Sequence, residues 1–317
     1  MHVIRPSLPS KVLGKSGVSV STVGLGCAWL GLQDGALDED LALRTVWSAL
    51  EAGVTLIDTA PLYLRRVSER IVGRALRERP DLARGVTVET KVGHWPEGFD
   101  YSYDMAMRCV EGSIDRLGLT HFPLLYIHDA PLEAFERVMA PDGALAALRK
   151  LQNEGVVGSV GIAVNDPTPN AAYIETGAFD IAVVPEAYSL LNQTAVERIF
   201  PAAERNKMGI VLAVPLEKGL LATGVQPGAS YSARHFSPDC LAHVQKIESV
   251  CQRHDVSLLA AALQFCTRQQ VVATVIPGAR TPEEAKANAR AAAEVIPDAF
   301  WNDLQPLIRH WEKGVHR

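Results

Sequence analysis

The chain has 317 residues, of which 48% are hydrophobic and 21% charged, and its formal net charge is −5. This is the balance of a globular protein with enough apolar residues for a large core. The small negative charge and the lack of a basic block argue against a nucleic-acid partner. No apolar run approaches the roughly 18 residues that a membrane span needs, and the first residues lack a signal-peptide pattern. We therefore expect a cytoplasmic protein without a membrane or nucleic-acid partner.

The cysteines are scattered along the chain, and their number is odd. They are Cys27, Cys109, Cys240, Cys251 and Cys266. No pair has the spacing of a metal site or a redox motif. They are expected to be reduced thiols, which fits a reducing compartment.

Short β-branched apolar runs alternate with longer amphipathic stretches along nearly the whole chain. In chain order, eight runs have the composition of strands: Thr22–Gly26, Val54–Thr59, Gly85–Val92, Phe122–His128, Ser159–Val164, Ile181–Pro185, Gly209–Pro215 and Val272–Pro277. Apolar residues at three- and four-residue spacing indicate helices that begin near Asp38, Ser68, Tyr103, Ala144, Thr168, Thr194, Pro238 and Thr281. Strands that alternate with helices imply a parallel sheet. The pattern predicts an α/β fold, a closed (β/α)8 TIM barrel, rather than an open doubly wound sheet.

Three further segments flank or interrupt these units. Lys11–Val20 predicts a hairpin with its turn at Lys15–Gly17, placed to plug the bottom of the barrel. An extra helix around Ala299–Trp311 is expected to pack outside the barrel. The Gly-, Pro- and Ser-rich stretch Gln226–Pro238 is either a flexible lid or a plain surface loop. None of these segments has the features of a linker, so we expect one domain over residues 1–317.

Four titratable side chains stand at or just beyond the ends of three consecutive strand-like runs. Asp58 ends the second run, and Tyr63 follows in the loop. Lys91 ends the third run and His128 ends the fourth. A (β/α)8 barrel carries its active site at the C-terminal ends of its strands. Each residue alone has an ordinary structural explanation, but four that converge on one mouth predict a catalytic site.

The chemistry follows from the pKa values of these groups. A free tyrosine has a pKa of about 10, and the ammonium group of Lys91 should lower the pKa of Tyr63. Asp58 can hold Lys91 in an ion pair, and His128 can donate a hydrogen bond to a carbonyl oxygen. This proton relay without a nucleophile suits the interconversion of a carbonyl and an alcohol, with Tyr63 as the acid and base. Because His128 and Asp129 are strand neighbours that should point in opposite directions, we expect no metal site.

The chain resembles the aldo-keto reductase superfamily over nearly its whole length. The motifs that carry the resemblance are LGKSGVSVSTVGLG, LIDTAPLYLRRVSERIVGRAL, ETKVG, RLGLTHFPLLYIHD, SVGIAVN, PLEKGLLATG and VIPGARTPEEAKAN. LLYIHD and AYSLLNQ look closest to the bacterial branch that contains aldose (L-fucose, D-threo-aldose and L-galactose) dehydrogenases and pyridoxal dehydrogenase. The resemblance implies a nicotinamide cofactor and a catalytic tetrad, which maps onto Asp58, Tyr63, Lys91 and His128.

The resemblance also implies which residues bind the cofactor. The nicotinamide amide would contact Asn165, and its ring would stack on Tyr188. The phosphates would lie in the loops Pro215–Leu221 and Gly278–Asn288, after the last two strands, as the barrel rule also expects. The residues implied in these loops are Pro215, Leu216, Gly219, Leu221, Gly278, Ala279, Arg280, Glu284 and Asn288.

Four positions bear on the choice between NAD and NADP. Relatives that prefer the phosphorylated cofactor often carry Lys, Ser and Arg where this chain has Gly278, Ala279 and Glu284. Glu284 would repel a 2′-phosphate, although it could also be a solvated residue that the helix dipole favours. Arg280 favours NADP instead, because its guanidinium group could reach a 2′-phosphate. We expect NAD ahead of NADP.

Three departures from the family pattern affect the mouth. The usual glycine-containing loop YGxGxSE is replaced by Tyr63–Glu69, which carries two arginines, Arg65 and Arg66. These arginines either bind an anionic or polyhydroxylated substrate or are solvated and paired with surface acids. The family's Ser-Asn pair is replaced by Ala163–Asn165, and a common glutamine by Pro185.

The expected substrate pocket is lined by Trp29, Tyr63, Trp95, His128 and the loop Gln226–Pro238. We expect an NAD(P)-dependent oxidoreductase that resembles aldose 1-dehydrogenases and converts a sugar hemiacetal to a lactone. One alternative is an NADPH-dependent reductase of small aldehydes or ketones. A second is a regulatory subunit on the same barrel with vestigial activity, as the potassium-channel β-subunits are. A third is a lyase or aldolase with Lys91 as a Schiff base, which would need a lysine without a carboxylate partner.

Overall fold

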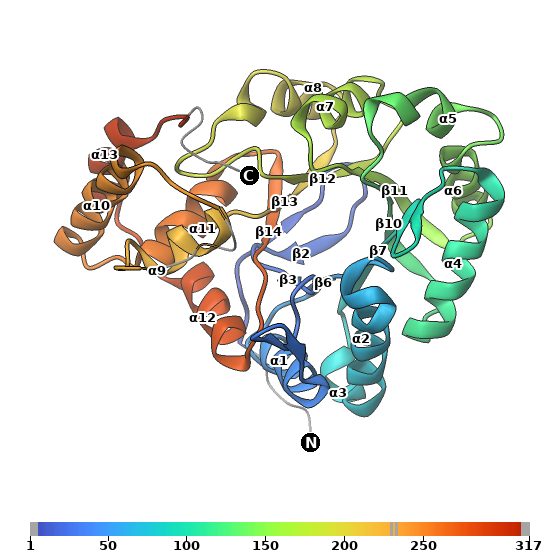
Figure 1. Ribbon diagram of the computed structural model, residues 1–317, viewed down its shortest axis with the longest axis horizontal. Coiled ribbons are helices and arrows are strands. Elements are labelled where there is room, and N and C mark those ends of the chain that lie inside the picture. The colour runs from blue at the N-terminus through green and yellow to red at the C-terminus, as the bar shows by residue number, and fades with distance from the viewer. Residues whose placement is uncertain (1–5, 229–230, 232–233, 312–317) are drawn as a thin grey trace.

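Eight parallel strands form the centre of the computed structural model, which describes residues 6–228, 231 and 234–311 (Figure 1). In spatial order they are β14 (Val272–Ile276), β13 (Gly209–Ala213), β12 (Ile181–Pro185), β11 (Val157–Ala163), β10 (Phe122–His128), β7 (Thr87–Val92), β6 (Leu56–Asp58) and β3 (Leu25–Gly26). Parallel bridges join Val23 to Val275 and Gly26 to Gly278, so the first strand meets the last and the sheet closes. The predicted (β/α)8 barrel is confirmed.

An outer layer of helices surrounds the strands in Figure 1. In chain order these helices are α1 (Glu39–Glu51), α2 (Val67–Glu78), α3 (Pro80–Ala83), α4 (Tyr103–Leu117), α5 (Phe135–Met139), α6 (Ala144–Asn153), α7 (Pro167–Glu175), α8 (Ile199–Arg205), α9 (Leu220–Thr223), α10 (Pro238–Arg253), α11 (Leu258–Arg268), α12 (Pro282–Ala293) and α13 (Asp298–Leu304). Side-chain oxygens of Asp38, Ser102, Ser237, Ser257 and Thr281 cap the starts of α1, α4, α10, α11 and α12. Such caps satisfy amide groups that a helix leaves unpaired, and they fix where each helix begins.

Two loops that follow barrel strands contain small antiparallel ladders. After β3, β4 (Leu32–Gln33) pairs with β5 (Ala36–Leu37). After β7, β8 (His94–Trp95) pairs with β9 (Gly98–Phe99). Both ladders follow the C-terminal ends of their strands, so they add structure to the mouth of the barrel.

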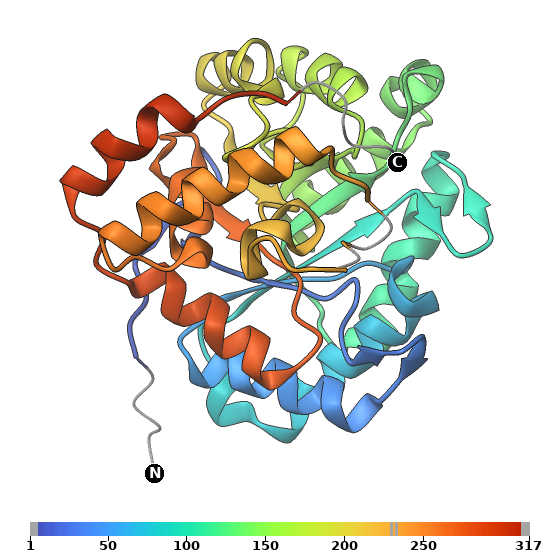
Figure 2. The ribbon, with the colours of Figure 1, turned by 60° about the vertical axis from the view of Figure 1, so that its left-hand side comes forward.

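The single helix expected from Pro238 is in fact two helices, α10 and α11. The chain leaves α10 at His254, Asp255 has a φ of 53°, and Ser257 then caps α11. The second helix, α11, packs against β14 and is therefore the barrel helix between the last two strands. The first, α10, packs on α11 and α13 at the outside (Figure 2).

Two other expected helices have different boundaries. The helix expected at Ala299–Trp311 is only α13, followed by one 3-10 turn at Gln305–Leu307. Pro306 lies in this turn and has no backbone N–H with which to continue the helix. The stretch expected to be helical from Thr194 starts with a 3-10 turn at Thr194–Val196, and α8 begins only after it.

The predicted N-terminal hairpin plugs one end of the barrel. It consists of β1 (Ser10–Val12) and β2 (Ser19–Ser21), paired antiparallel. Leu13 and Val20 are fully buried in the apolar cluster that fills the inside of the barrel. Gly14 bridges to the residue before β13, so the hairpin covers the N-terminal ends of the strands. The C-terminal ends are left as the open mouth.

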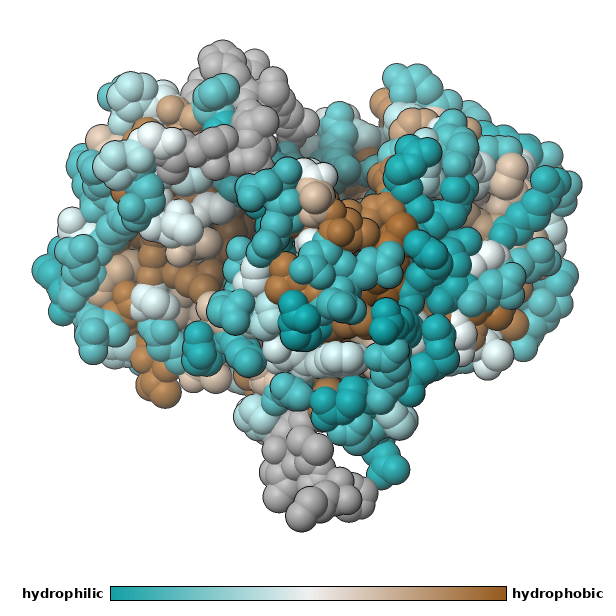
Figure 3. All heavy atoms as spheres, turned by 60° about the horizontal axis from the view of Figure 1, so that its bottom comes forward, coloured by the Kyte–Doolittle hydropathy of each residue, from teal (hydrophilic) through white to brown (hydrophobic). Residues whose placement is uncertain are grey.

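The face of the molecule in Figure 3 is mainly hydrophilic, and its apolar side chains gather in recessed areas between polar ones. Among the helices that the structure describes, none is both long and apolar enough to cross a bilayer. All five cysteines are buried and free, as the sequence predicted for reduced thiols.

The plug can be tested by shortening Leu13. We expect Leu13→Ala to lower the free energy of unfolding by about 2–5 kcal/mol, because a cavity is left where the hairpin fills the barrel. The neighbouring Val12 is 58% exposed, so Val12→Ala should change the stability by at most about 0.5 kcal/mol. Urea unfolding followed by circular dichroism measures both. Equal effects would contradict the role of the plug.

Candidate active site

The four residues of the predicted relay meet at the mouth. Asp58 ends β6 and His128 ends β10, while Lys91 lies at the fifth position of β7. Nζ of Lys91 donates hydrogen bonds to Oδ1 of Asp58 and, at 2.9 Å, to the carbonyl oxygen of Thr59. The ring of Tyr63 has its centroid 4.6 Å from Nζ of Lys91 and 5.8 Å from the ring centroid of His128. The four side chains therefore form one contiguous group.

Burial and charge act against each other on Lys91 and Tyr63. Burial alone would lower the pKa of Lys91, but the charge of Asp58 and its hydrogen bond to Lys91 raise this pKa above its ordinary value, so Lys91 stays an ammonium ion. The pKa of Tyr63 is raised by burial and then by Asp58, and Lys91 only partly offsets this. The expected net lowering of the pKa of Tyr63 is therefore wrong for the free protein. Tyr63 is a neutral phenol there, ready to act as an acid.

His128 is neutral as well, because burial lowers the pKa of His128 to about 3. Its Nδ1 is buried and has no hydrogen-bond partner in the described part of the chain. Its Nε2 lies 3.4 Å from Oδ2 of Asp129. A proton on Nδ1 would be a buried, unpaired donor, so we assign the proton to Nε2. That atom can then donate to a substrate oxygen.

The alternation of side chains along a strand predicted that Asp129 points away from His128, but this prediction is wrong, because the two side chains lie 3.4 Å apart. A φ of 49° at Asp129 turns its side chain back to the mouth. Its Oδ2 lies 2.9 Å from Nδ1 of His94, and its Oδ1 accepts a hydrogen bond of 2.8 Å from Asn165. Burial would raise the pKa of Asp129, but the hydrogen bond to His94 and the neighbouring histidines hold it below the ordinary value. An ionised carboxylate thus stands beside the relay.

His94, His128 and Asp129 offer one ligand atom each within 4.8 Å of one another, which is a donor set that zinc accepts. Metal-bound imidazoles normally donate their other ring N–H to an acceptor. Zinc on Nε2 of His128 would leave the proton on the buried Nδ1, for which the described residues offer no acceptor. The three side chains fit a hydrogen-bonded cluster better than a metal centre.

Backbone strain gathers at the same end of the barrel. Eight of the eleven described non-glycine residues with positive φ follow the ends of β6, β10, β12 and β13; they are Leu64, Arg65, Arg66, Asp129, Glu186, Val214, Glu217 and Lys218. Left-handed backbone costs a non-glycine residue about 1–2 kcal/mol. Such residues cluster at functional sites. The strained residues therefore lie at the same end of the barrel as Asp58, Lys91 and His128.

The loops after β13 and β14 have backbones that suit an anion. Glu217, Lys218 and Gly219 have consecutive positive φ values of 46°, 55° and 109°. Gly278 has open space where a Cβ would stand, and α12 begins soon after it with Thr281 as its cap. Successive N–H groups in such loops and at helix starts bind phosphates readily.

Several side chains that the resemblance implied as cofactor contacts in these loops are buried. The buried ones are Pro215, Leu221, Ala279 and Asn288, while Leu216 is partly buried. They shape the loops from within, and the exposed Gly278 is open to a ligand.

A cluster of charges ties the loop after β13 to the barrel. Arg234 donates to Glu217 at 2.7 Å and to Glu186 at 2.6 Å, and it is only 8% exposed. Nζ of Lys218 lies 2.5 Å from the other oxygen of Glu186. The stretch Gln226–Pro238 is therefore anchored to the barrel at Arg234; its residues 229–230 and 232–233 lie outside the described residues.

The other residues that the resemblance implied as cofactor contacts already contact other residues of the protein. Asn165 is exposed at the mouth and binds Asp129. The ring of Tyr188 stacks on Phe265 with the centroids 5.0 Å apart, so one of its faces is occupied. Glu284, in the first turn of α12, accepts a hydrogen bond of 2.7 Å from the backbone N–H of Arg280, which precedes the cap residue Thr281.

An apolar rim surrounds the mouth. Trp29, Phe99 and Leu132 follow the ends of β3, β7 and β10 and are 54%, 58% and 51% exposed. The guanidinium of Arg280 lies 6.0 Å from the ring centroid of Trp29, so this tryptophan stands between the rim and the cofactor loop. Trp95 is partly buried and packs against the core instead.

The sequence analysis missed several residues of the site. Tyr101 donates to the carbonyl oxygens of His128 and Asp129, and Glu89 lies beneath Lys91 in the barrel. Glu89 could have been found, because it precedes Lys91 by two residues and strand residues at that spacing share a face. His94 and Tyr101 follow β7 in a loop and carry no such signal.

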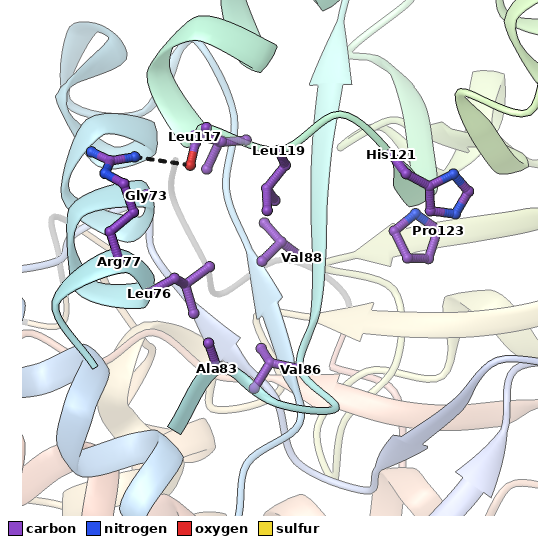
Figure 4. Close-up of a pocket in the computed structure, with 11 residues that line it drawn as sticks. Gly73, Leu76, Arg77, Ala83, Val86, Val88, Leu117, Leu119, His121 and Pro123 are labelled. Atoms are coloured by element: carbon purple, nitrogen blue, oxygen red, sulfur yellow. Dashed lines mark hydrogen bonds between the residues drawn. The ribbon is translucent and has the colours of Figure 1, made fainter. Parts of the chain in front are cut away.

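A separate hollow of about 310 Å³ lies between α2, α4 and the early parts of β7 and β10 (Figure 4). Arg77 lines one edge of it and donates to the carbonyl oxygen of Leu117 at 3.2 Å. Val88 and Pro123 line it near the starts of their strands, at the end of the barrel opposite the relay. The hollow is therefore not part of the active site.

Comparison with known proteins agrees with this geometry. The profile of the Aldo/keto reductase family matches residues 22–309. The chain belongs to the aldo-keto reductase family. Pyridoxal 4-dehydrogenase of Microbacterium luteolum is 29% identical over 93% of this chain and 96% of its own length. D-threo-aldose 1-dehydrogenase of a Pseudomonas species is 30% identical over 91% of this chain and 94% of its own length.

Solved structures give the same result. An aldo-keto reductase from Bacillus halodurans in its holo form superposes with a TM-score of 0.80 and 26% identity, over 97% of this chain and 98% of that one. Glycerol dehydrogenase from Gluconobacter oxydans superposes with a TM-score of 0.74 and 26% identity, over 91% of both chains.

The loop after Tyr63 is where this aldo-keto reductase departs from the pattern that the sequence resembles. Leu64, Arg65 and Arg66 have φ values of 48°, 51° and 72°, the region that glycine adopts without strain. Arg66 pairs through both amino groups with Glu97 in the turn between β8 and β9. The sequence left two explanations for Arg65 and Arg66, substrate binding and pairing with a surface acid. Arg66 is paired with a surface acid, Glu97.

The strain in this loop predicts that glycine stabilises it. We expect Arg65→Gly to raise the free energy of unfolding by about 1 kcal/mol, because Arg65 is exposed, has a left-handed backbone and makes no side-chain hydrogen bond with the described residues. Arg70→Gly is the control: Arg70 is exposed within α2, where glycine should cost about 1 kcal/mol. Thermal unfolding measures both. A loss of stability in Arg65→Gly would show that the loop is not strained.

Proposed function

We propose that this aldo-keto reductase is an NAD(P)-dependent dehydrogenase that acts on a sugar, interconverting a hemiacetal and a lactone in the manner of an aldose 1-dehydrogenase. The observation that carries the proposal is the buried Asp58–Lys91 pair against the ring of Tyr63, with the neutral His128 beside it. The similarity to D-threo-aldose 1-dehydrogenase and to the L-galactose dehydrogenase of Arabidopsis thaliana supports a sugar as the substrate.

The relay moves one proton at the substrate oxygen. Nε2–H of His128 orients that oxygen toward Tyr63. In reduction the phenol of Tyr63 donates its proton to the oxygen, and in oxidation the phenolate accepts the proton of the hydroxyl. Lys91 stabilises the phenolate, and Asp58 keeps Lys91 charged and in place. A bound nicotinamide would supply or accept the hydride.

The residues present fit a nicotinamide dinucleotide. The turn Glu217–Gly219 and the open approach at Gly278 would hold its phosphates, and Asn165 and Tyr188 would flank its nicotinamide. We propose NAD ahead of NADP, because the exposed carboxylate of Glu284 in the first turn of α12 would repel a 2′-phosphate bound at this loop.

The rim supports the same substrate class. Trp29 and Phe99 offer apolar surfaces on which a sugar ring could stack. The ionised Asp129 beside His128 would repel an anionic substrate and accept hydrogen bonds from hydroxyl groups. Neutral aldoses therefore fit better than sugar phosphates or sugar acids.

The alternatives differ in measurable ways. A reductase of small aldehydes would turn over aldehydes with NADPH faster than aldoses with NAD, and a spectrophotometric screen of both pairs decides between them. A regulatory subunit would show little turnover with either. Schiff-base chemistry is disfavoured because Lys91 is paired with Asp58; borohydride trapping with a ketose tests it.

The relay predicts the effect of removing one hydroxyl group. Tyr63→Phe should lower kcat by about 100-fold or more while cofactor affinity stays nearly unchanged, because the proton donor is lost and the ring remains. Tyr103→Phe on α4 is the matched control and should keep the wild-type rate. Stopped-flow turnover and fluorescence titration of the cofactor measure the two quantities. A wild-type rate for Tyr63→Phe on several substrates would exclude the mechanism.

The cofactor preference depends on the charge of Glu284. Glu284→Gln keeps an acceptor for the N–H of Arg280 and removes the charge, so the affinity for NADP relative to NAD should rise about tenfold, or about 1.4 kcal/mol. Glu283→Gln, one residue away and also exposed, is the control and should change the ratio little. Fluorescence titration with both cofactors gives the ratios. A wild-type protein that already prefers NADP would reverse the assignment in favour of Arg280.

A further inference from the structure

A second carboxyl group lies inside the barrel beneath the relay. Glu89 is on β7, two residues before Lys91, and is 0% exposed. Its partner in the register between β6 and β7 is Asp58, so the two acidic residues are neighbours across the strands on the inner face. Beneath the ammonium of Lys91 the barrel therefore holds two carboxyl groups, although one would be enough to balance its charge.

The contacts of Glu89 indicate which form it takes. Its Oε2 accepts a hydrogen bond of 2.8 Å from the hydroxyl of Tyr126 on β10, and Tyr126 is also 0% exposed. Its Oε1 is buried and no donor in the described part of the chain reaches it. A carboxylate would leave this oxygen as an unpaired buried charge, which is costly, whereas a carboxylic acid can place a donor there.

Electrostatics points the same way. Burial raises the pKa of Glu89 well above its ordinary value, and the charge of Asp58 raises it further, while Lys91 and Tyr126 oppose this. A side-chain hydrogen bond with Asp58 is among the causes that raise it. Two carboxyl groups that share one site hold a proton between them. Because Asp58 is bound to Lys91, the proton resides on Glu89.

We propose that Glu89 is a proton-bearing positioning residue that donates a hydrogen bond from its carboxylic acid to Asp58 and thereby tunes the acid strength of Tyr63. Asp58 raises the pKa of Tyr63 and Lys91 lowers it. A hydrogen bond donated to Asp58 disperses its negative charge, so Lys91 acts on Tyr63 with less opposition. Tyr126 supports the arrangement, because its bond to Oε2 makes the acid of Glu89 a stronger donor.

The effect on turnover rests on the proposed function, but the protonation state of Glu89 does not. Infrared spectroscopy of the wild-type protein in neutral buffer should contain the C=O stretch of a buried carboxylic acid, and Glu89→Gln should lose it. This measurement needs no substrate. A spectrum in which Glu89→Gln removes only a carboxylate band would overturn the proposal even if the enzyme were fully active.

Kinetics tests the tuning. Glu89→Gln keeps a neutral donor, so the pKa that Tyr63 shows in the pH profile should stay within about 0.3 units and kcat within about twofold. Glu89→Leu removes the donor and should raise that pKa by about one unit. In the oxidation direction this lowers kcat/KM about tenfold below the pKa. Equal profiles for Gln and Leu, or a lowered pKa in Glu89→Gln, would overturn the proposal.

A further variant guards against a failure of Glu89→Leu to fold. Tyr126→Phe leaves Glu89 and the relay intact and removes one hydrogen bond. It should raise the pKa of Tyr63 in the same direction as Glu89→Leu, by a smaller amount. Tyr173→Phe is the control, since Tyr173 is equally buried but lies on α7 outside the barrel. A pH profile of Tyr126→Phe identical to that of Tyr173→Phe would contradict the tuning. If the wild-type enzyme showed no turnover, the proposed function would fail and the infrared result would still stand.

Discussion

The buried ion pair between Lys91 and Asp58 is the interaction on which the rest of the site depends. Both side chains are almost inaccessible to water, at 1% and 2% exposure. Removing one partner of such a pair leaves an uncompensated buried charge and costs about 3–5 kcal/mol. The pairing joins β6 to β7 in addition to their backbone ladder, whose register places Asp58 opposite Glu89. The ring of Tyr63 then lies against the ammonium group of Lys91 and beside the ring of His128.

Periodicity and the rule about strand ends were enough to predict the barrel and the meeting of Asp58, Tyr63, Lys91 and His128 at one mouth. Most of the strands were recognisable because they are short, mainly apolar runs that are buried on both sides, whereas β7 reads TVETKV and is less apolar. Asp58, Lys91 and His128 stood out because they end or nearly end such runs. The helix boundaries were harder to predict, because a turn with a left-handed Asp255 divides α10 from α11 without a glycine or proline to signal it.

The parts that sequence reasoning missed depend on tertiary contacts or on an unusual backbone. Asp129 faces the mouth only because its own φ is positive, and alternation along a strand predicts the opposite. Arg66 finds Glu97 at a distance of 31 residues along the chain, in a hairpin that follows another strand. Arg234 is held by two acids from two different strand ends. No local pattern identifies such partners, since each contact exists only once the barrel has closed.

The burial of every thiol gives the molecule a set of natural probes. Cys27 lies just beyond β3, Cys109 is on α4, Cys240 and Cys251 are on α10, and Cys266 is on α11. Burial raises the pKa of each of them, so little thiolate is present at neutral pH and alkylating reagents react slowly with the folded protein. Each thiol becomes reactive only when its own region opens. The rates at which the five sites are alkylated therefore map the local opening of the barrel, from its first strand to its outer helices, without any introduced label.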